Sequence, residues 1–163
     1  MARALIVGCG CRGRALAAAL QAEGHGVRGT TRDEASLEVI AAVGAEAVIA
    51  DPNRLSTLTP HLEGMSLLYW LMGTARGEPE SLAALHGQRL ESLLETLVDT
   101  PVRGMVYEAA GTVDAGVLAG GAAHVRQMTD TFRMPSQVVI EDRNPHEAWL
   151  RAMTAAAGDV LSA

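Results

Sequence analysis

One ten-residue stretch near the N-terminus constrains the fold more than any other part of the chain. A short apolar run, Ala4 to Val7, leads directly into three glycines at Gly8, Gly10 and Gly13, and an alanine-rich helical pattern follows at once. The pattern predicts a strand, a tight turn and a helix start. The first glycine permits the turn, the second lets the backbone approach a ligand, and the third lets the helix pack closely on the strand. Because free N–H groups at a helix N-terminus attract anions, this stretch indicates a site for the pyrophosphate of a dinucleotide.

The rest of the chain alternates apolar strand-like runs with helical patterns, which is typical of a parallel sheet covered by helices on both faces. Six strands are expected, at residues 4–7, 25–31, 45–50, 65–72, 102–109 and 137–141. Helices are expected at residues 12–23, 36–43, 54–62, 80–99 and 114–132, and after Asn144-Pro145. That dipeptide is expected to give a cap and a proline at the first helical position.

The length and the element order together predict the architecture. The 163 residues contain no repeat or linker, so we expect one α/β domain over residues 1–163. Its expected form is a single-domain Rossmann fold in three α/β/α layers, with a six-stranded parallel sheet in the order 3-2-1-4-5-6. The ligand crevice is then expected outside the carboxyl ends of strands one and four.

Four short motifs, in order on the predicted elements, carry a resemblance to a known family. They are GCGCRG at residues 8–13, TTRD at 30–33, Asp51-Pro52 after the third strand and LMG at 71–73. With these motifs the chain resembles the atypical and extended short-chain dehydrogenase/reductases, of the NAD(P)-binding epimerase/dehydratase-like kind, over roughly its whole length. The resemblance implies an adenine contact from Asp51 and a cofactor floor from the LMG motif. The expected cofactor-binding residues are Gly8, Gly10, Cys11, Arg12, Gly13, Thr31, Arg32, Asp51, Leu71, Met72 and Gly73.

The residue that follows the second strand bears on the choice between NADP and NAD. NAD-specific proteins usually carry an acidic residue there for the ribose 2′-hydroxyl, whereas Arg32 suits a 2′-phosphate, with Arg12 as a second cation. Asp33 is the competing feature, because a one-residue shift would make it the ribose ligand and favour NAD. Asp51 has an alternative role as the cap of a helix that begins near Asn53. We expect NADP(H) as the cofactor, with NAD as the alternative.

The catalytic residues that the resemblance implies are missing from this chain. Dehydrogenases of this type use a tyrosine whose pKa is lowered by a lysine four residues later, and a serine at the end of the fifth strand. The chain contains no lysine, and its two tyrosines, Tyr69 and Tyr107, lie inside predicted strands. Ala109 and Ala110 stand where the serine is expected. Small residues occupy positions 120–123, where the tyrosine is expected.

Two classes of function remain open after this comparison. The first is a cofactor-binding or sensor-like protein without tyrosine–lysine catalysis. The second is an oxidoreductase that passes a hydride from NADPH to a flavin, a quinone, or a small carbonyl or nucleotide-sugar substrate. Glu108 or His124 is the weaker candidate for an improvised proton donor.

Composition limits the partners and the location. The net charge of −6, with no basic cluster, argues against nucleic-acid binding, and no apolar run is long enough to span a bilayer. Cys9 and Cys11 are too close for a good disulfide and lack the clustered histidines of a metal site, so we expect a reducing cytoplasm and no metal.

The leucines of the 80–99 helix exceed one packing stripe, which predicts a homodimer.

Overall fold

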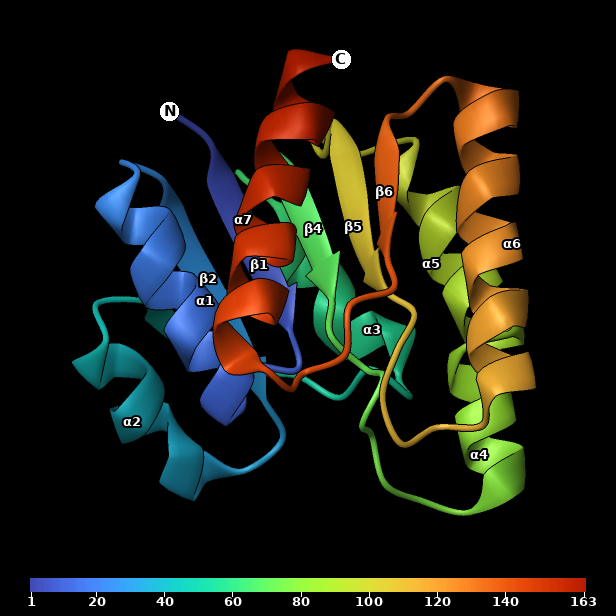
Figure 1. The fold of residues 1–163 in the computed structure, drawn as a ribbon, viewed down its shortest axis with the longest axis horizontal. Helices are drawn as coiled ribbons and strands as arrows, with labels where there is room; N and C mark the ends of the chain where they lie inside the picture. The colour runs from blue at the N-terminus through green and yellow to red at the C-terminus, as the bar shows by residue number, and fades with distance from the viewer.

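Six parallel strands form one sheet in the order β3-β2-β1-β4-β5-β6 in the computed structural model, which describes all 163 residues (Figure 1). The strands are β1 (Arg3–Val7), β2 (Gly26–Thr31), β3 (Glu46–Ile49), β4 (Leu67–Trp70), β5 (Gly104–Glu108) and β6 (Ser136–Val139). The predicted sheet order and fold class are therefore confirmed. Since all strands run the same way, their carboxyl ends meet at one edge of the sheet, the lower edge in Figure 1.

The two central strands are almost wholly apolar because helices cover both of their faces. Every residue of β4 is buried, as are the last four residues of β1. Side chains alternate between two core clusters, so Ile6 and Tyr69 pack on one face while Val7 and Trp70 pack on the other. This double burial explains why the strands read as continuous apolar runs in the sequence.

Three helices cover one face of the sheet, and four helices cover the other (Figure 1). The first set is α1 (Cys11–Ala22), α2 (Leu37–Ala42) and α7 (His146–Ser162), and the second is α3 (Leu55–Leu58), α4 (Pro79–Leu85), α5 (Gln88–Leu97) and α6 (Ala115–Phe132). Two 3₁₀ turns, Glu34–Ser36 and Thr59–Leu62, complete the structure. None of these helices combines the length and apolar character needed to cross a membrane.

The prediction of one helix over residues 80–99 is wrong, because His86 and Gly87 separate α4 from α5. A Cβ atom at Gly87 would lie 2.7 Å from the carbonyl oxygen of Ala83, so the break requires glycine. The leucine pattern continues across the break because both helices face the same core. The buried leucines are Leu85, Leu90, Leu93, Leu94 and Leu97. The leucine surplus that predicted a homodimer is thus taken up inside the chain.

Two other helices differ from the expectation. The predicted 54–62 helix is one short turn, α3, followed by a 3₁₀ turn, because Pro60 falls where an α-helix would need another backbone donor. Pro145 is the N-cap of α7 rather than its first residue. Asn144 does not cap that helix, because its side-chain oxygen accepts a hydrogen bond from Arg12 Nη2 at 3.0 Å.

His86, at the break between α4 and α5, connects three parts of the core. Its ring is buried, with Nε2 3.0 Å from the carbonyl oxygen of Met72 and Nδ1 2.6 Å from the hydroxyl oxygen of Tyr107. A carbonyl oxygen can only accept, so Nε2 carries the hydrogen and Nδ1 accepts from Tyr107. Burial lowers the pKa of His86, with opposing contributions from the Met72 carbonyl and the Glu108 charge. The ring is therefore held in its neutral form.

The contact between α6 and Tyr107 gives a matched pair of glycine substitutions. A Cβ atom at Gly121 would overlap the Tyr107 hydroxyl group, whereas a Cβ atom at Gly120 would meet nothing within 4 Å. We expect Gly121→Ala to lower the free energy of unfolding by about 1–3 kcal/mol through overpacking. Gly120→Ala should raise it by about 0.5–1 kcal/mol, because alanine is the better helix former. Urea denaturation measures both values, and equal effects of the two variants would contradict the packing.

The lowered pKa of His86 predicts that stability falls in mild acid. The unfolded chain binds a proton near the ordinary pKa of 6.5, while the folded chain binds it only at lower pH. The free energy of unfolding should therefore decrease as the pH falls below about 6.5. His86→Gln should reduce this slope between about pH 7 and pH 5.5. A slope that His86→Gln leaves unchanged would refute the assignment.

Candidate functional site

A cavity opens at the carboxyl edge of the sheet, between the segments that follow β1 and β4. This is the crevice position that the sequence predicts. Four arginines line it, Arg14, Arg32, Arg76 and Arg143, and its lining contains no aspartate or glutamate. Arg143 is ion-paired with Glu108, whereas the other three arginines have no ion-pair partner in the chain, so the cavity is cationic although the chain has a net charge of −6. Such a concentration of arginine favours a ligand with several negative charges.

The glycine turn after β1 forms one wall of this cavity. Gly8 has φ +92°, and a Cβ atom there would overlap the Met72 side chain and lie 2.6 Å from the Leu71 carbonyl oxygen. Gly10 faces open space, where a Cβ atom would meet no other atom within 4 Å, and it precedes α1 without a side-chain cap. A Cβ atom at Gly13 would lie 2.9 Å from the Gly8 carbonyl oxygen. The turn therefore leaves its backbone exposed to a ligand at Gly10 and closely packed at the other two glycines.

The first turn of α1 offers unpaired backbone donors at the same place. The N–H groups of Cys11 and Arg12 donate to no backbone acceptor, and no acidic residue lies in this turn. Cys11 is exposed and Arg12 reaches Asn144, so neither side chain lines the cavity, whereas Arg14 does. Cys9 is buried, and burial raises the pKa of its thiol to about 11, which suits a packing role. The anion-attracting feature of this turn is thus its backbone and Arg14.

The segment after β2 holds Arg32 and Asp33, the two candidates for contact with the ribose 2′ group, in different environments. Arg32 is exposed, lines the cavity and makes no hydrogen bond or ion pair within the chain. The Asp33 carboxylate accepts from the Ala35 N–H at 3.0 Å and caps the first 3₁₀ turn, outside the cavity lining. Thr31 and Ser36 also line this end of the cavity. At the end of β2 the cavity is therefore lined by Arg32, Thr31 and Ser36, and Asp33 does not line it.

The segment after β3 gives Asp51 a local role. Its Oδ1 atom accepts a hydrogen bond from the Asn53 N–H at 2.9 Å, which forms a tight turn before α3. Ala50, Pro52 and Asn53 line the cavity, but Asp51 does not. The carboxylate lies close to the cavity and is used in the turn that shapes the cavity wall.

The segment after β4 supplies the floor. Leu71 and Met72 line the cavity, while Gly73 is buried beneath it. The Gly73 N–H donates to Glu108 Oε1 at 3.0 Å, and a Cβ atom at Gly73 would overlap the Ala110 carbonyl oxygen. The loops after β4 and β5 are therefore locked together at backbone distance. This packing requires glycine at position 73 for a structural reason.

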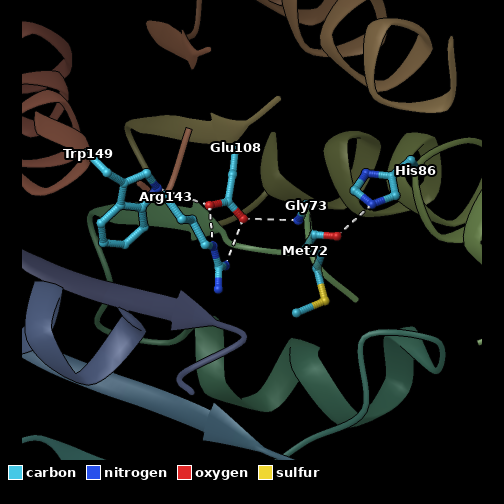
Figure 2. Close-up of polar contacts among 6 residues, drawn as sticks. All are labelled: Met72, Gly73, His86, Glu108, Arg143 and Trp149. Carbon is cyan, nitrogen blue, oxygen red and sulfur yellow. Dashed lines mark hydrogen bonds and ion pairs between the residues drawn. The ribbon is translucent and has the colours of Figure 1, made fainter. Parts of the chain in front are cut away.

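Sequence reasoning missed the network around Glu108 (Figure 2). This carboxylate is fully buried and accepts four hydrogen bonds. Arg143 donates from Nε and Nη2, each at 2.9 Å, the Trp149 indole N–H donates at 3.0 Å, and the Gly73 N–H completes the set. An acidic residue at the end of an apolar strand was a visible signal, but its arginine partner, 35 residues away, was not.

Neither of the improvised proton donors suggested by the sequence suits that role here. Both oxygens of Glu108 are occupied as hydrogen-bond acceptors in a site without contact to solvent. His124 is on α6, and its Nδ1 atom lies 3.0 Å from Oε1 of Glu91 on α5. It does not line the cavity. Both suggestions are corrected by these contacts.

Both tyrosines are buried in the core. Tyr107 donates to His86, and the Tyr69 hydroxyl donates to the Met153 carbonyl oxygen at 2.7 Å. Burial raises the pKa of each phenol above its ordinary value, with a smaller contribution from Glu108 at Tyr107 and from Glu23 at Tyr69. A tyrosine that works as a proton relay near neutral pH needs the opposite shift. Both tyrosines therefore have a packing role in the core.

No protein-family model matches the chain, and no curated protein matches its sequence. Solved structures do match, at low sequence identity. A putative NAD-dependent epimerase/dehydratase from Bacillus halodurans is 15% identical with a TM-score of 0.72, over 87% of this chain and 71% of that one. UDP-glucuronic acid 4-epimerase from Bacillus cereus, in complex with NAD, is 15% identical with a TM-score of 0.69, over 86% and 56%.

A third match is the triphenylmethane reductase of Citrobacter sp., complexed with NADP(H). It is 16% identical with a TM-score of 0.65, over 83% of this chain and 48% of that one. The chain spans about half the length of most of these proteins, including 50% of gox2253. At such identities the likeness concerns the fold. The chain therefore has a Rossmann fold similar to that of these epimerases and reductases.

Proposed function

We propose that the chain binds NADP(H) in the cavity at the carboxyl edge of the sheet. The pyrophosphate would lie against the exposed backbone at Gly10 and the unpaired N–H groups of the first turn of α1. The adenosine half would extend toward β2 and β3, and the nicotinamide half toward Met72. The observation that carries the proposal is the lining itself, which contains no carboxylate and four arginines, three of them without an ion-pair partner in the chain.

The position of Arg32 supports NADP(H) over NAD(H). Its guanidinium has no partner in the chain, while the competing Asp33 carboxylate is committed to the Ala35 N–H. A 2′-phosphate at this place would meet Arg32 together with the hydroxyl groups of Thr31 and Ser36. The ribose 2′-hydroxyl of NAD would meet the same cation without the carboxylate that usually binds it. Charge complementarity therefore favours the phosphorylated cofactor.

We expect NADPH to bind more tightly than NADH by at least about tenfold, because one charge-assisted contact to a phosphate contributes about 1.5–3 kcal/mol. Arg32→Ala should remove most of this preference. Asp33→Asn is the matched control, because an amide oxygen still accepts from the Ala35 N–H, and it should keep the preference. Titration by cofactor fluorescence measures all affinities. Equal affinities of the wild-type protein for the two cofactors would overturn the proposal.

We further propose that the protein binds its cofactor without tyrosine–lysine catalysis, as a cofactor-binding or sensor-like protein. The absence of lysine and the burial of both tyrosines support this. A reductase is the second candidate, favoured by the apolar cavity wall of Leu71, Met72 and Leu82. Such a wall suits an acceptor ring, such as a flavin or quinone, for which the cofactor supplies the hydride chemistry when bound and the protein orients the rings.

Substitution of Tyr107 separates these two functions from ordinary dehydrogenase catalysis. We expect Tyr107→Phe to leave any turnover of aldehydes, ketones or sugar nucleotides with NADPH unchanged. The variant should lose about 1–3 kcal/mol of stability, because His86 Nδ1 is left without a donor. Tyr69→Phe serves as a control for the loss of a buried tyrosine hydroxyl. Robust wild-type turnover that disappears in a folded Tyr107→Phe protein, but persists in the control, would show that the tyrosine is catalytic.

A further inference from the structure

The Arg143 guanidinium lies at the cavity, with contacts at Nε, at Nη2 and to the Trp149 ring, and with no partner at Nη1. Its Nε and Nη2 atoms donate to Glu108, and its guanidinium lies 5.7 Å from the centre of the Trp149 ring. The third nitrogen, Nη1, makes no hydrogen bond within the chain, and Figure 2 shows a guanidinium nitrogen turned away from Glu108 without a partner. The residue lines the cavity, and its side chain is 19% exposed.

The carboxylate that holds this arginine is itself in an unusual position. A buried carboxylate destabilises a fold unless donors surround it, and Glu108 has four donors at 2.9–3.0 Å. A flexible arginine side chain loses freedom on binding a ligand, whereas a guanidinium clamped by Glu108 and Trp149 has already lost it. The arrangement therefore presents a cation in a fixed orientation, which is the property of a preorganised anion site.

The loop that carries Arg143 connects two parts of the cavity wall. The Arg143 side chain reaches the end of β5, and the next residue, Asn144, accepts from Arg12 in the first turn of α1. The loop follows β6, so Arg143 approaches the cavity from the β4–β5–β6 half of the sheet. Arg32 approaches it from the end of β2, in the other half. The two arginines thus serve opposite ends of the same cavity.

We propose that Arg143 binds an anionic oxygen, of a phosphate or a carboxylate, through Nη1 at the end of the cavity opposite Arg32. Glu108 and Trp149 are positioning residues that fix its guanidinium. The anion belongs either to the dinucleotide pyrophosphate or to an acidic substrate bound beside the cofactor. This assignment rests on the proposed dinucleotide site, and it adds a second specificity determinant to that site.

The test replaces the ion pair with two neutral amides, because removal of Arg143 alone would leave Glu108 buried and unpaired. The double variant is Glu108→Gln/Arg143→Gln, and the control is Glu147→Gln/Arg151→Gln, which makes the same change of charge on exposed positions of α7. Three affinities are measured: that for NADPH, that for adenosine 2′-monophosphate, and that for oxalate or inorganic phosphate with protein already saturated with NADPH. Thermal unfolding and circular dichroism report whether each variant is folded.

The double variant should lose at least about tenfold in one of two affinities. A loss for NADPH assigns Arg143 to the pyrophosphate, and a loss for oxalate or phosphate assigns it to a substrate anion. Adenosine 2′-monophosphate, whose single phosphate would bind at the Arg32 end, should keep its affinity, and so should every ligand with the control variant. A merely structural role of Arg143 would lower thermal stability and leave all three affinities unchanged in the folded variant, which overturns the proposal.

A structure of the wild-type protein with NADPH and oxalate decides the matter if the double variant does not fold. We expect an anionic oxygen within hydrogen-bond distance of Arg143 Nη1, and an anion-free Nη1 would overturn the inference. Failure of the wild-type protein to bind NADPH or NADH at all would instead contradict the proposed function. Normal NADPH binding with no role for Arg143 contradicts only the inference.

Discussion

A carboxylate without access to water must obtain its hydrogen-bond donors from the protein, and Glu108 obtains its donors from three different segments. One is the loop after β4, one is the loop after β6, and one is α7. Because the energy of an isolated buried charge is so unfavourable, these segments have one acceptable arrangement around the end of β5. The position of the cavity wall follows from that requirement, since Met72 precedes Gly73 and Arg143 is one of the donors.

The features that the sequence predicted are those whose signal is local. The turn glycines show their roles through neighbouring residues, and the strands of a doubly covered sheet are continuous apolar runs, so the sheet order could be inferred before any contact was known. Residues whose partners lie far along the chain could not be placed this way. His86 finds Tyr107 21 residues away, and Glu108 finds Arg143 35 residues away. The helix break at Gly87 was also hidden, because leucines on both sides of it face one core.

Ligand binding and proton transfer have separate structural requirements. An anion site needs unpaired donors at an exposed turn, which Gly10 and the start of α1 provide. A proton relay needs a titratable group that reaches the ligand with a suitable pKa. Here the two phenols are buried and their pKa values are raised, while His86 is buried and its pKa is lowered. These three side chains are occupied in holding the core together.

The bond between Trp149 and Glu108 also bears on the order in which the site can form during synthesis. The glycine turn and Arg32 leave the ribosome well before β4, so at that stage β1 can pair with β2 and not yet with β4. The wall beyond Met72 cannot be completed until Arg143 and Trp149 have emerged to satisfy the carboxylate. A partly synthesised chain therefore carries the glycine turn without a finished cavity, and the complete cavity wall forms only in a chain that has been extended into α7.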